Sequence, residues 1–198
     1  LYVKGRFKSL LISSDGEKYS PEGIEEALVE KSKYIDQVML YNNQSAYTTA
    51  LIVPNREALK RKLSHLNLTL DTEEGCKAAV KKLEEELAKY KKGGEFEGMF
   101  PERWLPTTFA VLAEPFTEQN QMINSTMKMV RGKIEKAYAA CIDYMYTAEG
   151  KQTQNQQNIN ALKYNLKRQL LQVYPSNIHK KLSTILFEKK CFTNYIKV

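Results

Sequence analysis

Two polar segments of this sequence carry residue types that could bind phosphate. The first runs from Arg6 to Lys18 and combines three cations with a glycine in the stretch GRFKSLLISSDGEK. The second, NSTMKMVR, places Thr126, Lys128 and Arg131 in a loop before a predicted helix. A glycine loop exposes backbone N–H groups, and cations beside it attract phosphates. The alternative is ordinary surface, because a chain with 30 Lys and Arg residues places some of them in loops by chance.

The sequence contains none of the motifs that mark a self-contained active site. It has no GxxxxGKS/T loop, no GxGxxG, no HExxH and no Ser/His/Asp set in a recognisable context. His65 and His179 lie beside lysines in predicted helices, which is typical of solvated surface. The run Glu84 to Glu86 also has lysine neighbours, as on an exposed helix face. We therefore expect no metal site and no complete catalytic centre.

Charge and cysteine content limit the classes of protein to consider. The net charge is +7, but residues 151–198 hold nine Lys and Arg against Glu188 alone, which leaves 21 Lys and Arg against 22 Asp and Glu in residues 1–150. The basic character belongs to the tail, so no nucleic-acid partner is expected for the main domain. No segment approaches the ~18 apolar residues of a membrane span, and the first residues are too charged for a signal peptide. Three cysteines without CxxC spacing favour a reducing cytoplasm.

The main domain has a pattern typical of α+β proteins. Residues 1–13 predict two short strands with a break near Lys8, and Ser20 is expected to cap a helix that begins at Pro21. The other predicted strands are 35–42 and 47–55, joined as a hairpin by the polar turn NNQSA, and 107–116. The other predicted helices are 56–66, Thr72 to Gly93, and 132–146, the last preceded by the polar loop 117–131.

The architecture expected from these elements is a small mixed sheet flanked by helices, preceded by a short two-stranded segment and followed by a helical tail. Residues 150–160, GKQTQNQQNIN, are rich in Gln and Asn, and we expect them to be too polar to pack. Two amphipathic helices are predicted beyond them, at 161–174 and 177–190. The predicted domain limits are 1–12, 13–147 and 148–198.

Two motifs give the chain a resemblance to a known family. GRFKSLLISSDGEKYSPEGIEEA resembles the linker and first helix of the C-terminal domain of AMP-forming acyl-CoA synthetases. FTEQNQMINSTMKMVRGKI is similar to the segment of the long-chain fatty acyl-CoA synthetases that ends in T-M/L-K-x-x-R, and LIVPN between them fits the same branch. The motifs occur in the family's order and spacing. The resemblance covers about residues 1–147, with 1–12 as the hinge or linker hairpin and 13–147 as the lid domain.

The resemblance implies a role for each matched residue. Arg6 would contact the ribose hydroxyls of the adenylate, and Lys8 would be the hinge whose backbone turns between half-reactions. Lys128 would be the catalytic lysine of the adenylation step. Three further residues would line the pantetheine channel in the thioester-forming state: Asp15, Gly16 and Lys18.

The resemblance also implies an activity and its partners. The expected reaction is acid plus ATP to acyl-AMP and pyrophosphate, followed by transfer of the acyl group to CoA. In this family the linker lies inside the chain, so we expect Leu1 to be a cut point and the isolated fragment to be inactive. The missing N-terminal domain would bind the fatty acid and most of the ATP, AMP, CoA and Mg²⁺.

Two alternatives remain open at this point. Ser9, Asp15, Gln121 and Ser125 depart from the family pattern, and they leave an acyl carrier protein as a second acceptor besides CoA. The other alternative is a non-catalytic binding module whose basic tail docks on anionic lipid or nucleic acid. The expected location is cytoplasmic, with contact of the tail at the inner face of the membrane as an open question.

Overall fold

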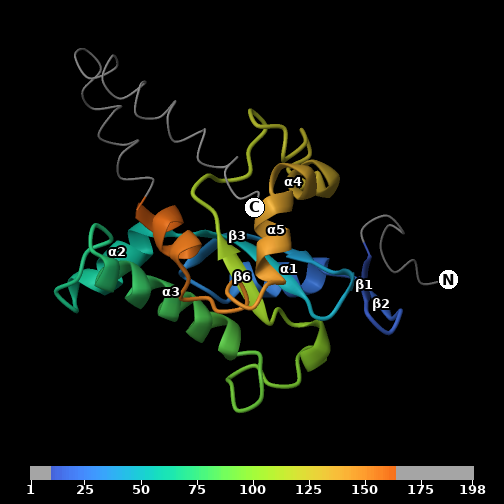
Figure 1. Cartoon of the computed structure of the whole chain (residues 1–198), viewed down its shortest axis with the longest axis horizontal. Coiled ribbons are helices and arrows are strands. Elements are labelled where there is room, and N and C mark those ends of the chain that lie inside the picture. The colour runs from blue at the N-terminus through green and yellow to red at the C-terminus, as the bar shows by residue number, and fades with distance from the viewer. Residues whose placement is uncertain (1–9, 164–198) are drawn as a thin grey trace, which may run out of the picture. The chain divides into compact units, whose positions relative to one another are not determined.

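The computed structural model describes residues 10–163, so the predicted roles of Arg6 and Lys8, and the tail beyond Lys163, lie outside the described residues. The central sheet has the strand order β3-β5-β6 (Figure 1). Strand β3 (Ile35–Tyr41) runs antiparallel to β5 (Thr49–Pro54), and β6 (Thr108–Val111) runs parallel to β5. The predicted hairpin and the predicted α+β class with a small mixed sheet are therefore confirmed.

A second sheet lies toward the N-terminus, with the order β2-β1-β4. Strand β1 (Leu11–Ser13) pairs antiparallel with β2 (Lys18–Tyr19) and parallel with β4 (Asn43–Ser45). Strand β4 lies within the segment predicted as the turn NNQSA. That prediction was incomplete, because the polar residues of β4 gain their backbone partners from β1, about thirty positions away, and not from local sequence.

Helices cover the central sheet, and some of their ends differ from those predicted from capping residues and glycines in the sequence. Helix α1 (Glu22–Glu30) has Pro21 at its N-cap with no side-chain cap, so the predicted capping by Ser20 is wrong. Helix α2 (Arg56–Ser64) and helix α3 (Glu73–Ala88) begin at Asn55 and Thr72, whose side chains accept hydrogen bonds from the first turns. Helix α3 ends at Ala88, before the predicted Gly93, because the chain passes into consecutive turns.

The predicted helix 132–146 is two helices, α4 (Arg131–Ala137) and α5 (Ala139–Met145). The break falls at Tyr138, whose φ of −111° and ψ of 20° are not helical. The two short helices both reach the core, since Ile134 of α4 and Ile142 and Met145 of α5 are buried in one cluster. The bend at Tyr138 allows side chains of both helices to be buried in the same cluster. Tertiary packing has therefore overridden the continuous helical pattern of the sequence.

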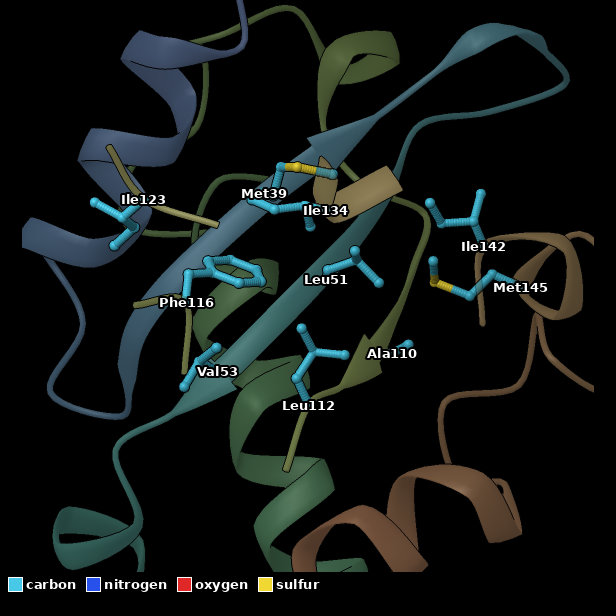
Figure 2. Close-up of a cluster of buried hydrophobic side chains, with 10 residues drawn as sticks. All are labelled: Met39, Leu51, Val53, Ala110, Leu112, Phe116, Ile123, Ile134, Ile142 and Met145. Atoms are coloured by element: carbon cyan, nitrogen blue, oxygen red, sulfur yellow. The ribbon is translucent and has the colours of Figure 1, made fainter. Parts of the chain in front are cut away.

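That cluster is built on the central sheet and closed by residues from the polar loop 117–131 and its neighbours (Figure 2). Met39, Leu51 and Ala110 come one from each strand, and Figure 2 shows Phe116 and Ile123 lying with them. Ile123 belongs to the predicted loop 117–131, so one apolar side chain of that loop is buried in the core. Burial of each large apolar side chain stabilises the fold by about 1.5–3 kcal/mol.

The Gln/Asn-rich segment packs against this fold, contrary to prediction. Asn155, Asn158, Ile159 and Leu162 are buried, and residues 156–163 are helical. Asn158 accepts from the Val111 backbone N–H (2.7 Å) and donates to the Phe109 carbonyl (3.1 Å). These amide contacts satisfy the open edge of β6, which explains how a polar segment can pack. The compact unit that contains the fold extends to Lys163.

Candidate functional site

Lys128 lies in a tight hairpin-like loop that connects Phe116 to α4. Ile123 and Met129 form an isolated antiparallel bridge, and the Val130 N–H donates to the Met122 carbonyl at 2.8 Å. With Ile123 buried in the core, these contacts fix the two sides of the loop. The tip from Ser125 to Lys128 is exposed. The sequence prediction of an exposed polar loop before a helix is confirmed here.

The ammonium group of Lys128 projects from an ordered backbone. The side chain makes no hydrogen bond or ion pair within residues 10–163, while its backbone N–H donates to Asn124 Oδ1 at 2.9 Å. The neighbouring Met127 has a φ of 59° and is 74% exposed. An exposed cation on a fixed loop is suited to meet an anion supplied from outside the domain.

Arg131 has a different role from the one suggested by its position in the sequence. It begins α4 and is only 14% exposed, and its guanidinium pairs with the carboxylate of Glu25 in α1. The other guanidinium nitrogen donates to the Leu40 carbonyl at 3.0 Å, and Glu25 accepts from the Leu40 N–H at 2.6 Å. Burial raises the pKa of Glu25, and the nearby Arg131 opposes that rise. Arg131 is thus an anchor of the loop and not an exposed phosphate ligand.

Neither Glu25 nor Asn124 stood out in the sequence. Glu25 is one of several glutamates in a predicted helix, and Asn124 is one of many polar residues in its loop. Their importance comes from their partners: Glu25 and Arg131 are 106 positions apart. An Asn four residues before a candidate lysine is a weak local signal, since Asn often accepts from nearby backbone N–H groups.

The β1–β2 hairpin holds the other three described site residues. Gly16 has a φ of 83°, which permits the turn, and its N–H donates to the Ser13 carbonyl at 2.9 Å. Its backbone therefore does not offer a free N–H to phosphate, contrary to the expectation from the glycine loop. Asp15 accepts from the Ser13 hydroxyl and from the Glu17 N–H (3.2 Å), and these hydrogen bonds lower the pKa of its carboxyl. Asp15, Gly16 and Lys18 are all exposed.

Two residues distant in sequence, Arg103 and Trp104, clamp this hairpin through contacts with its side chains. Glu17 accepts from Arg103 (2.5 and 2.7 Å) and from the Trp104 indole N–H (3.0 Å), and these bonds lower the pKa of Glu17. The rings of Tyr19 and Trp104 stack with centroids 5.1 Å apart. Within the described residues, no hydrogen bond or ion pair joins Asp15 or Gly16 of this hairpin to the side chain of Lys128. Figure 1 shows the hairpin and the loop before α4 at separate places on the domain.

A cavity of about 640 Å³ lies elsewhere, between α3, the start of β6 and residues 151–154. Lys91 and Glu84 line it, and burial lowers the pKa of Lys91 and raises that of Glu84. None of the predicted site residues lines this cavity.

His65 is exposed just after α2, and His179 lies outside the described residues. Over residues 10–163, no cluster of His, Cys, Asp and Glu could hold a metal, and no helix could cross a bilayer.

Comparison with known proteins shows which family this chain is similar to. Residues 8–92 match the family described as AMP-binding enzyme C-terminal domain. The chain is 28% identical over 152 residues to long chain acyl-CoA synthetase 8 of Arabidopsis thaliana, covering 74% of this chain and 20% of that protein. It is 26% identical over 147 residues to a chloroplastic long-chain fatty acid–acyl-carrier-protein ligase of the same plant, covering 74% and 18%.

A solved structure shows the same fold in a larger protein. The adenylation domain of a carboxylic acid reductase from Segniliparus rugosus, determined with AMP and a co-purified carboxylic acid, is 25% identical with a TM-score of 0.56. The match covers 74% of this chain and 21% of that one. The chain spans about a fifth of the length of the relatives it matches.

Proposed function

We propose that this chain is the C-terminal lid domain of a long-chain fatty acid–CoA ligase, a proposal supported by the match of residues 8–92 to the AMP-binding enzyme C-terminal domain and by the similarity to a long chain acyl-CoA synthetase. The observation that supports this most is the Lys128 loop. It presents an ammonium group with no partner within residues 10–163, on a backbone that is anchored in the core and by the Arg131–Glu25 pair. The isolated chain is expected to form no acyl-AMP, because the acid and ATP would bind mainly to the rest of the enzyme.

The proposed role of Lys128 follows from the charges of the first half-reaction. A carboxylate that attacks the α-phosphate of ATP brings two anions together, and negative charge accumulates at phosphorus. An ammonium between the two groups reduces the repulsion and orients the attack. Lysine suits a lid because it is a point charge on a flexible stem, which can be inserted into the site and withdrawn.

The second half-reaction has different needs, which we propose a second face of the domain supplies. The thiol of CoA must reach the acyl carbonyl, so Lys128 has to leave the space it occupied during adenylation. The β1–β2 hairpin with Asp15, Gly16 and Lys18 would then line the thiol channel, and Lys8 would serve as the hinge. The separate placement of the hairpin and the Lys128 loop supports such an alternation, as does the clamp that keeps the hairpin in a fixed shape.

The acceptor of the acyl group is the least constrained part of the proposal. One relative is named for CoA and another for acyl carrier protein, at nearly equal identity. Carrier-protein loading is therefore the second candidate function. Supplying the intact enzyme with either CoA or a phosphopantetheinylated carrier protein, each with the same acyl-AMP, would separate the two by the product formed.

The direct test uses the intact parent enzyme with Lys128→Ala. Adenylation, measured from acid and ATP, should fall by about 10²–10³, as when other single electrostatic groups are removed. Thioester formation from preformed acyl-AMP should stay close to wild type. Lys136→Ala is the matched control, since Lys136 is an exposed lysine on the neighbouring α4. If Lys128→Ala adenylates as well as the control, the proposed role of this loop is wrong.

A further inference from the structure

We propose that Asn124 is a positioning residue for adenylation, because its side chain fixes the backbone from which Lys128 projects; this inference rests on the function proposed for Lys128. The oxygen Oδ1 of Asn124 accepts three hydrogen bonds. The donors are the Thr126 N–H (3.0 Å), the Thr126 hydroxyl (2.9 Å) and the Lys128 N–H (2.9 Å). One side-chain oxygen therefore binds polar groups of two of the four residues in the loop tip, Thr126 and Lys128.

The backbone of Asn124 completes the arrangement. Its N–H donates to the Lys128 carbonyl at 2.9 Å, and its own carbonyl accepts from the Met127 N–H at 2.9 Å. Both peptide groups of Lys128 are thus tied to Asn124, one through the side chain and one through the main chain. These two bonds restrict the φ and ψ of Lys128 and hence the direction of its Cα–Cβ bond.

The tip has little else to hold it. Ser125, Thr126, Met127 and Lys128 are all exposed, so apolar packing contributes little to their order. Met127 also has a φ of 59°, a conformation that costs a non-glycine residue about 1–2 kcal/mol and persists only where the surroundings enforce it. The Asn124 hydrogen bonds on either side of Met127 are the described contacts that enforce it. Without Oδ1, the tip should sample other conformations.

Such sampling would affect one reaction step more than the rest. A displacement of about 1 Å in a catalytic group can cost 10² in rate. Lysine's flexible stem should recover part of this loss, so we expect Asn124→Ala to slow adenylation about tenfold in the intact enzyme. The effect should fall on kcat and not on the KM for ATP, because ground-state binding does not depend on the tip. Thioester formation from preformed acyl-AMP should be unchanged.

A double-mutant cycle separates positioning from general structure. If Asn124 acts through Lys128, then Asn124→Ala should add no loss to Lys128→Ala. Asn124→Asp keeps the acceptor oxygen and should restore most of the adenylation rate. Asn120→Ala is the matched control: Asn120 Oδ1 likewise accepts from two backbone N–H groups, of Thr117 (2.9 Å) and Met122 (3.2 Å), without touching the tip. It should adenylate like wild type.

The outcomes distinguish this inference from the one it rests on. Full activity of Lys128→Ala would remove the proposed function itself. A large effect of Lys128→Ala with none of Asn124→Ala would overturn the positioning role alone. Equal losses in both half-reactions, or a further loss in the double variant, would make Asn124 a structural residue. The thioester assay serves as the folding control throughout, since an unfolded lid would fail in both assays.

Discussion

At the scale of single residues, the buried pair of Arg131 and Glu25 anchors the C-terminal end of the Lys128 loop, where α4 begins. Replacing Arg131 with Ala leaves the carboxylate of Glu25 only 5% exposed and without its cation, and it also removes a donor from the Leu40 carbonyl. Breaking a buried pair in this way costs about 3–5 kcal/mol. Urea unfolding should show this loss in the free energy of unfolding.

The control for this prediction is Arg103→Ala. Its ion pair with Glu17 lies at the surface, where side-chain entropy and solvent offset most of the attraction, so only a small change in stability is expected. The variant Arg131→Met with Glu25→Leu removes both charges and should recover much of the stability. Equal stabilities of Arg131→Ala and Arg103→Ala would show that the buried pair is not an anchor.

The sequence identified exposed residues better than buried partners. Lys128 was correctly expected on an exposed loop, because polar residues surround it and a helix follows. Arg131 was grouped with it as a possible phosphate ligand, and the structure contradicts this. The two cations are three residues apart and look alike in sequence, yet one is paired with Glu25, 106 positions away. A pair of this separation leaves no local signal.

At the scale of elements, Tyr90 joins the end of α3 to α1. Its hydroxyl donates to the Ala27 carbonyl at 2.7 Å, and burial raises the pKa of Tyr90 from 10.0 to about 12. Because the folded-state pKa lies above the unfolded value, the contribution of the hydroxyl to stability is complete below pH 10 and is lost as the pH rises toward 12. Tyr90→Phe should cost about 1 kcal/mol near neutral pH.

The pH dependence of the difference is the measurement that matters. The gap in unfolding free energy between wild type and Tyr90→Phe should shrink between pH 10 and about 12. Taking a difference removes the effect of lysines that titrate in the same range. Tyr34→Phe is the control, since the Tyr34 hydroxyl makes no hydrogen bond within residues 10–163, and it should follow wild type. A gap that stays constant with pH would contradict the assignment.

Elements with their own periodic signal were predicted well, and those that depend on distant partners were not. The β3–β5 hairpin and helices α2 and α3 follow from apolar alternation, helical spacing and the capping residues Asn55 and Thr72. Strand β4 and the break at Tyr138 have no such signal. The first needs β1 as a partner, and the second lets α4 and α5 both reach the core.

At the scale of the whole molecule, the extent of the folding unit is the property that composition misjudged. Residues 150–160 are polar enough to suggest a linker, but Asn158 satisfies the edge of β6, and Ile159 and Leu162 are buried. The guanidinium of Arg56 further binds the Ala161 and Leu162 carbonyls at 2.8 and 2.7 Å. A Gln/Asn-rich segment can therefore belong to a core when its amides replace a missing strand.

Two shortened chains test this extent. A chain that ends at Thr147 lacks the buried side chains of Ile159 and Leu162, whose burial contributes about 2 kcal/mol each. Its free energy of unfolding should therefore be about 4 kcal/mol lower or more, and it should melt roughly 10 °C below a chain that ends at Lys163.

Within the full chain, Asn158→Ala should be destabilising by about 1–3 kcal/mol, because it leaves the buried Val111 N–H unpaired. Asn160→Ala, at an exposed position of the same helical segment, should have little effect. If both shortened chains melt at the same temperature, residues 150–162 are a linker, and the domain ends where the sequence first suggested.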